Sequence, residues 1–276
     1  MKRRKTKAKF NPKKHAFSFS PSLVLFPEEK EHLQEQLWDH IQTVPDKLHD
    51  LLGPSASFCH MDQIITSLKK PTIPDEITTG FEYLLMDYYY SWRLIPSEKK
   101  FHKKLNHKEY RSYVLKRITD QLLESVEDVY LSELIPKLRV DQEMVDVQLQ
   151  GHPYFSTQLT VELPIKKDWH QAHAQKNWEI LKEKLDCGKP AIILLAGSKA
   201  GLFKPNHMIV YDYELLDDVS LVITACNQHR QTSQFRFTFR NGFIVEWLVQ
   251  GKTILLDWVK SMYSSEYESI KPIVIN

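Results

Sequence analysis

The sequence has few cysteines and no long apolar run, and each absence excludes a class of protein. Its three cysteines, Cys59, Cys187 and Cys226, are too few and too odd in number for a disulfide framework, so we expect a reducing compartment. The longest apolar runs, such as 191–197 and 254–259, fall far short of the roughly 20 residues that a membrane span requires. Because no apolar stretch follows the basic N-terminus, we expect no Sec-type signal peptide and a cytoplasmic location, with delivery by another secretion route left open.

Net charge is also small, at +2, but it is unevenly distributed. The first 14 residues carry eight of the 37 lysines and arginines and no acidic residue, so the rest of the chain is net acidic. Like charges repel one another, stay solvated and attract polyanions. We therefore expect residues 1–16 to form a basic disordered tail. It either serves only as a solvated terminus or localisation signal, or contacts a polyanion through Lys2, Arg3, Arg4 and Lys5.

Apolar residues recur at helical spacing in the first half of the chain, which at 42% hydrophobic residues can bury one large core or two lobes. An extended arm is expected over residues 17–27, because this stretch alternates apolar and small polar residues and contains two prolines. Helices are expected to begin at Pro27 and to cover residues 79–92 and 107–135. Residues 17–140 are therefore predicted to form a helical lobe.

The second half changes character and reads as mainly antiparallel β structure. A helix over 169–185 should end at Cys187-Gly188, since glycine supplies the left-handed conformation that helix C-termini favour. Asn241-Gly242 indicates a tight hairpin. The expected strands cover residues 191–197, 207–215, 219–225, 235–240 and 243–249. Residues 141–276 are thus predicted to form a β lobe, and the whole chain an α+β protein.

Cys59 is the candidate nucleophile. The turn over residues 53–57 delivers the chain to Phe58-Cys59, which places Cys59 in the first turn of a helix. Unsatisfied N–H groups at a helix start stabilise a thiolate and can also stabilise an oxyanion. Taken alone, Cys59 is better explained as a small buried residue that packs the turn, which is where most free cysteines lie.

His207 and Asn227 complete a candidate catalytic set. His207 opens an alternating strand, where the sheet can hold its imidazole rigidly as a general base. Asn227 follows the next strand, where its amide can orient the histidine ring. A cysteine nucleophile needs such a base and an orienting group, which are usually distant in sequence.

His207 follows Cys59 by 148 residues, and Asn227 follows His207 by 20. This order and approximate spacing resemble the papain-like cysteine peptidases, in which histidine and asparagine follow the cysteine by about 130 to 150 residues. Short motifs carry a closer resemblance, to a group of uncharacterised bacterial papain-like proteins. These have a Cys-Gly-Gly-Met helix start, a Gly-Arg-Pro strand start, Asn-His-Gln-Val before a strand, and Tyr-Asp-Pro-Asn. The corresponding stretches here are Phe58-Cys59-His60-Met61, Gly188-Lys189-Pro190, Asn206-His207-Met208-Ile209 and Thr224-Ala225-Cys226-Asn227.

This resemblance implies a papain-like two-lobe fold, with Cys59 on the helical lobe and His207 and Asn227 on the β lobe. It implies a cysteine-dependent hydrolase or acyl transferase acting on an amide, ester or thioester bond, with a peptide or protein as a candidate substrate. His60 replaces a family glycine, and Ala225 and Cys226 replace the Asp and Pro of the last motif. A papain-like scaffold without catalysis, binding a protein, peptide or polyanion, therefore stays open as the alternative.

Two further groups of residues have simpler explanations. His170 and His173, with Cys226 and His229, have spacings that a zinc site uses, but twelve histidines make such a coincidence unsurprising. We assign no metal and no cofactor. The aromatic residues Tyr83, Tyr88, Tyr89, Tyr90 and Trp92 are expected to pack in the core and between the lobes rather than to stack on bases.

Overall fold

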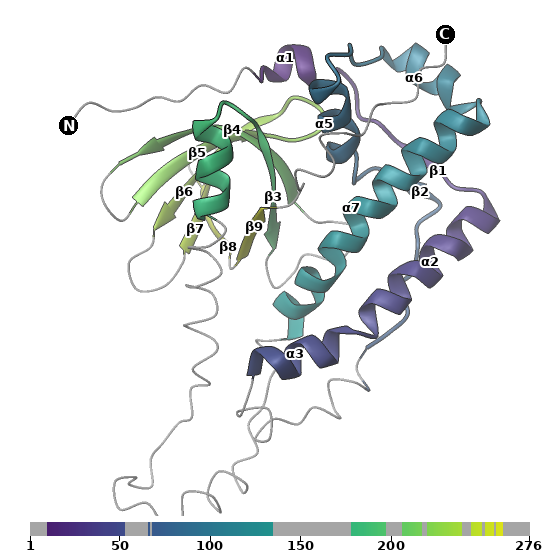
Figure 1. Ribbon diagram of the computed structural model, residues 1–276, viewed down its shortest axis with the longest axis horizontal. Helices are drawn as coiled ribbons and strands as arrows, with labels where there is room; N and C mark the ends of the chain where they lie inside the picture. Colours follow the sequence, from purple (N-terminus) through teal and green to yellow (C-terminus); the bar gives the residue numbers. More distant parts are fainter. Residues whose placement is uncertain are drawn as a thin grey trace, which may run out of the picture.

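The computed structural model shows helices in the first part of the chain and an antiparallel sheet in the second (Figure 1). The predicted α+β class is therefore confirmed. The residues that the structure describes are 10–52, 66, 68–134, 178–196, 206–216, 220–238, 244–249, 252–256 and 258–261. Within these ranges, no helix is both long enough and apolar enough to cross a membrane.

The helices follow the apolar spacing of the sequence. They are α1 (Pro12–His15), α2 (Pro27–Ile41), α3 (Val44–Leu52), α5 (Glu82–Tyr90), α6 (Glu98–Leu105) and α7 (Lys108–Leu134). α2 begins at Pro27 as predicted, and the Glu29 carboxylate in its first turn accepts a hydrogen bond from the backbone nitrogen of Phe26 at 2.9 Å. α7 agrees with the helix predicted over 107–135. α5 is shorter than the helix predicted over 79–92.

Seven antiparallel strands form the main sheet, in the order β8-β7-β6-β5-β4-β3-β9. Their bounds are β3 (Ala191–Ala196), β4 (Asn206–Leu215), β5 (Ser220–Cys226), β6 (Thr232–Thr238), β7 (Ile244–Val249), β8 (Lys252–Leu256) and β9 (Trp258–Ser261). The five predicted strands correspond to β3 to β7, whereas β8 and β9 were not predicted. The predicted Asn241-Gly242 turn lies outside the described residues, but β6 and β7, which it joins, do pair.

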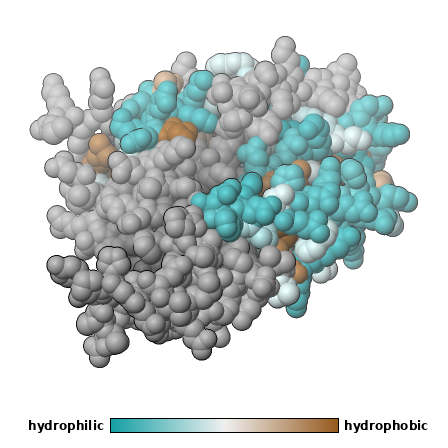
Figure 2. All heavy atoms as spheres, turned by 60° about the horizontal axis from the view of Figure 1, so that its bottom comes forward, coloured by the Kyte–Doolittle hydropathy of each residue, from teal (hydrophilic) through white to brown (hydrophobic). Residues whose placement is uncertain are grey.

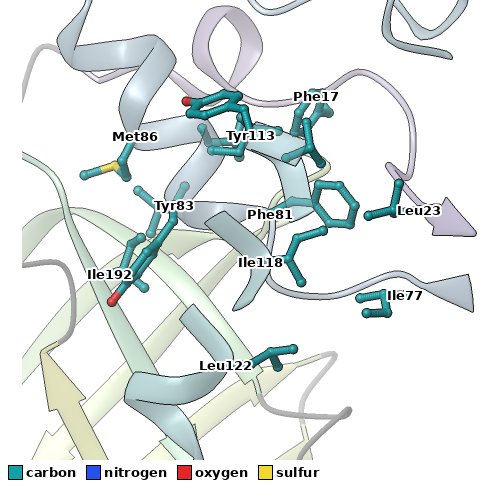
Figure 3. Packing of buried hydrophobic residues seen from close by; sticks show 14 of the residues in the cluster. Phe17, Leu23, Ile77, Phe81, Tyr83, Met86, Tyr113, Ile118, Leu122 and Ile192 are labelled. Carbon is teal, nitrogen blue, oxygen red and sulfur yellow. The ribbon is translucent and has the colours of Figure 1, made fainter. Parts of the chain in front are cut away.

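Among the described residues, side chains of the central strands β3, β4 and β5 are buried on both faces of the sheet. Side chains on one face, including Ile192, Leu194 and Ile209, join the core of the helices. Figure 3 shows this contact, with Tyr83 beside Ile192 where α5 meets the sheet. On the other face, Ile193, Met208, Val210 and their neighbours pack beneath the helix over residues 178–186. This two-sided burial holds β4 rigidly between two apolar layers.

A buried ion pair joins α5 to α7. The Arg117 guanidinium donates to both carboxylate oxygens of Asp87, from Nε at 2.6 Å and from a terminal nitrogen at 3.0 Å, and both side chains are almost completely buried. Arg117 also donates to Asp120 at 2.8 Å, and the Tyr113 hydroxyl donates to Asp87 at 2.6 Å. Because all of these charges are paired and hydrogen-bonded, the cluster orients α5 on α7.

The N-terminal arm crosses the helices and reaches the sheet, as predicted for residues 17–27. The backbone nitrogen of Phe17 donates to the carbonyl of Gln228 at 2.9 Å, and β1 (Leu23–Val24) pairs with β2 (Glu76–Ile77). Residues 10–16, predicted to belong to the basic tail, are instead part of the packed body. Phe10 is only 4% exposed, and its ring lies 5.3 Å from that of Tyr89, because an aromatic side chain there gains apolar contacts. Residues 1–9 lie outside the described residues.

Much of the surface formed by the described residues is polar, as is usual for a folded protein. Figure 2 shows one face, on which the described residues are mainly hydrophilic and hydrophobic side chains are scattered singly. Isolated apolar side chains on a surface need no functional explanation.

Candidate functional site

His207 is the best-defined member of the predicted catalytic set. It lies in β4 opposite Leu194 of β3. Because side chains alternate along a strand, the His207 ring points to the same face as Ile209, toward the helices. The residue is 3% exposed. The sheet therefore holds the imidazole in a fixed position, as expected of a rigid base.

Both ring nitrogens of His207 are buried, and neither has a hydrogen-bond partner among the described residues. Burial lowers the pKa of His207 to about 3, because a charged imidazolium would lose its hydration. The ring is therefore neutral near pH 7, which is the form that accepts a proton. A buried polar group without a partner costs free energy, so its presence requires an explanation.

Asn227 lies in the turn between β5 and β6, and its side-chain amide binds within that turn. The Oδ1 atom accepts from the backbone nitrogens of Gln231 at 2.9 Å and His229 at 3.2 Å. The Nδ2 atom lies 2.9 Å from Nε2 of His229 and donates to Oε1 of Gln231 at 3.2 Å. These contacts close the turn, and none of them reaches His207.

Cys59 lies outside the described residues, as do His60 and the turn that precedes them. The structure therefore gives no distance from the Cys59 sulfur to the His207 ring. Their pairing stays a prediction.

The other two cysteines have different surroundings. Cys226 is fully buried in the helical core, and burial, with the nearby Glu82 carboxylate, raises the pKa of its thiol to about 12. Such a thiol is almost wholly protonated at neutral pH and is a poor nucleophile. Cys187 is exposed at the end of the helix over residues 178–186.

The residues considered for a zinc site are not brought together in the described part of the chain. Cys226 lies in the core, whereas His229 is exposed in the turn after β5. His170 and His173 lie outside the described residues. Across the described ranges, no three His, Cys, Asp or Glu side chains are grouped as metal ligands.

Glu82, at the start of α5, was missed by the sequence analysis. It is 3% exposed, and its carboxylate accepts a hydrogen bond from Nε2 of Gln121 at 2.9 Å. Burial raises the pKa of Glu82 to about 7, although hydrogen bonds from Gln121 and from the Gln228 backbone act in the opposite direction. A carboxyl group of this pKa exchanges a proton near neutral pH. One sequence signal was available. Glu82 lies four residues before the apolar Met86, so a helix places both side chains on the same face.

Gln228 links the same region to the chain directly after β2. Its Nε2 atom donates to the carbonyl of Thr78 at 2.5 Å, whereas its buried Oε1 atom has no partner among the described residues. Gln228 follows Cys226 by two residues, and Cys226 pairs with Ile209, two residues beyond His207. The unpartnered ring of His207 and the unpartnered Oε1 atom of Gln228, both judged among the described residues, thus lie in one layer between the helices and the sheet.

Comparisons with known proteins add no assignment. No protein-family model, no curated protein and no solved structure matches this chain.

Proposed function

We propose that this chain is a cysteine-dependent hydrolase or acyl transferase with a papain-like two-lobe fold, acting on an amide, ester or thioester bond. Cys59 attacks the carbonyl carbon, His207 takes the thiol proton and returns it to the leaving group, and backbone N–H groups at the helix start stabilise the oxyanion. A reducing, cytoplasmic location is part of the proposal, because the nucleophile must stay a thiol.

The observation that carries this proposal is that the ring of His207 has no hydrogen-bond partner among the described residues. A purely structural histidine in a core is normally hydrogen-bonded, since an orphaned ring nitrogen is costly. Neither nitrogen of His207 is satisfied by a described residue, although the ring is 3% exposed. A catalytic base needs one nitrogen directed at the nucleophile, and Cys59 lies in the part of the chain that is not described.

The low pKa of His207 is compatible with this role. A neutral imidazole accepts the proton of a neighbouring thiol, and the thiolate that forms then stabilises the imidazolium by charge attraction. Asn227 can orient the ring only if its amide exchanges a bond to Gln231 or His229 for one to His207.

The second candidate is a scaffold of the same fold that binds a protein, peptide or polyanion without turnover. One observation favours it: the Asn227 amide is already engaged on both its oxygen and its nitrogen by its own turn. The replacements at His60, Ala225 and Cys226 point the same way. The basic tail, beginning with Lys2, would supply the polyanion contact.

Alkylation by iodoacetamide separates the two candidates, because each cysteine can be followed by peptide mass spectrometry. At about pH 6.5, Cys59 should react at least about tenfold faster than the exposed Cys187, and His207→Ala should remove this advantage. The buried Cys226 should stay unmodified and so report that each variant is folded. His32→Ala, which removes an exposed histidine from α2, is the matched control and should change nothing.

The catalytic proposal fails if Cys59 reacts no faster than Cys187 in the wild type and His207→Ala leaves its rate unchanged. For the scaffold, deletion of residues 2–14 should abolish salt-sensitive retention on heparin. Unchanged retention would show that the tail makes no such contact.

A further inference from the structure

We infer that the segment after α5, together with α6, is a docking surface for an anionic lipid membrane. This inference is independent of the proposed catalysis. It rests on two exposed apolar side chains, one of them on a residue in a left-handed backbone conformation, and on exposed lysines of α6 and α1 that form no ion pair among the described residues.

Trp92 occupies a position where a helix normally has glycine. Two crossed hydrogen bonds end α5, from the Arg93 nitrogen to the Tyr88 carbonyl at 2.9 Å and from the Trp92 nitrogen to the Tyr89 carbonyl at 3.1 Å. This pattern requires a left-handed residue, and Trp92 has a φ of 57°.

The helix over residues 178–186 ends with the same pair of bonds, from Lys189 to Lys184 and from Gly188 to Leu185. There the left-handed position is Gly188, with a φ of 73°. Glycine adopts this conformation without the steric cost that a β-carbon brings. Trp92 therefore carries a steric cost that Gly188, at the equivalent position of another helix, does not.

The Trp92 side chain gains nothing in return within the described protein. It is 86% exposed, and Leu94, two residues later, is 88% exposed. The aromatic packing predicted for this segment is confirmed for Tyr83 and Tyr88, which are buried, but is wrong for Trp92. Among the described residues, the other non-glycine residue with positive φ is Arg230, and its side chain donates to the Ala16 carbonyl at 3.0 Å.

Exposed lysines follow this apolar pair on α6 and also occur on α1. α6 begins four residues after Leu94, and Phe101 anchors its inner side in the core. Its exposed lysines are Lys99, Lys100 and Lys103, and α1 adds the exposed Lys13 and Lys14. None of these five lysines forms an ion pair with an acid in the described ranges.

α1 belongs to the same end of the molecule. The ring of its His15 lies 5.1 Å from that of Tyr89, three residues before Trp92. Figure 1 shows α1, the end of α5 and α6 along one edge of the protein.

The chemistry of the pair favours a membrane over a nucleic acid. A base stacks on an aromatic ring, but it makes no equivalent contact with a leucine side chain. A membrane interface accepts both residues, since tryptophan partitions to the headgroup region and leucine to the acyl boundary. Lysines around such an insertion bind anionic headgroups.

Sedimentation of the full chain with vesicles tests this inference. The protein should bind vesicles of phosphatidylcholine with phosphatidylserine, bind pure phosphatidylcholine much more weakly, and lose binding as salt rises. Trp92→Gly with Leu94→Ser should lower the partition coefficient about tenfold or more. The matched control, Leu215→Ser with Leu216→Ser, removes two exposed apolar side chains from the sheet and should leave binding unchanged.

Charge reversal provides the second arm. Lys99→Glu with Lys100→Glu should lower the partition coefficient about tenfold or more, whereas Lys69→Glu with Lys70→Glu, also exposed, should have a much smaller effect. Trp92→Gly alone should raise the urea midpoint of unfolding, because glycine relieves the backbone cost, while weakening vesicle binding. A loss of binding through unfolding is thereby distinguished from a loss of contact.

Three results would overturn the inference. One is equal binding to neutral and anionic vesicles, or none to either. Another is an equal loss of binding in the Leu215 and Leu216 control. The third is binding to a single-stranded oligonucleotide that requires Trp92, without binding to vesicles, which would assign the surface to nucleic acid.

Discussion

The ionisation of Glu82 should make the stability of this protein depend strongly on pH. Its pKa of about 7 in the folded protein lies above the ordinary 4.5, because burial removes the carboxylate from water. The folded protein therefore holds a proton that the unfolded chain releases, and it loses stability as pH rises from about 4.5 through about 7. The two pKa values correspond to about 3 kcal/mol of unfolding free energy.

Glu82→Gln is the perturbation that isolates this effect. Glutamine keeps an acceptor for the Gln121 amide but cannot ionise. At about pH 5 the variant and the wild type should differ by no more than about 1 kcal/mol, whereas at about pH 8.5 the variant should be more stable by up to about 3 kcal/mol. Urea unfolding followed by circular dichroism at several pH values gives both free energies.

The quantity to plot is the variant minus the wild type, because His207 contributes a pH dependence of opposite sign to both proteins. Glu35→Gln, an exposed change on α2, is the control and should give a flat difference near zero. A flat difference for Glu82→Gln as well, from about pH 5 to about pH 9, would refute the claim that burial holds this carboxyl group protonated.

Two further predictions concern buried charge. Arg117→Met should lower the unfolding free energy by about 3 to 5 kcal/mol, because Asp87 is left buried without its partner. Lys116→Ala, which removes an exposed ion pair with Asp120, should cost no more than about 0.5 kcal/mol, and similar losses from the two variants would contradict this account. For His207, whose folded pKa of about 3 lies below 6.5, stability is lost as pH falls below about 6.5. Between about pH 7 and about pH 4.5, the wild type should therefore lose about 3 kcal/mol more unfolding free energy than His207→Leu, and parallel curves would show that the ring is solvated.

Much of the local structure could be predicted, because it depends on neighbours in the chain. The start of α2 follows from Pro27 and the acid at Glu29, and α7 follows from apolar residues at helical spacing. β3 follows from a run of branched apolar residues. β9 was not predicted as a strand, and its place beside β3 rests on pairing between distant residues, which no local pattern records.

The candidate site could be predicted only in part. His207 was identified because a strand start holds a ring rigidly, but its burial depends on helices that pack over the sheet from more than 70 residues away. The pKa of Glu82 and the exposure of Trp92 also depend on how the elements of the fold pack, which the local sequence does not show. A carboxylate at a helix start is usually hydrated, and an aromatic residue in a tyrosine-rich helix usually packs.

The sequence by itself determined the longer helices α2 and α7, the strands β3 to β7, the α+β class and the residue types available for thiol chemistry, since these depend on spacing and side-chain identity. Only the tertiary structure decided which polar groups lose water and which apolar groups keep it. Glu82 and His207 are covered by the contact between helices and sheet, whereas Trp92 is left outside it. The physical reason is that burial is a property of the assembled layers, and the free energy of a charge or an apolar ring depends on that burial.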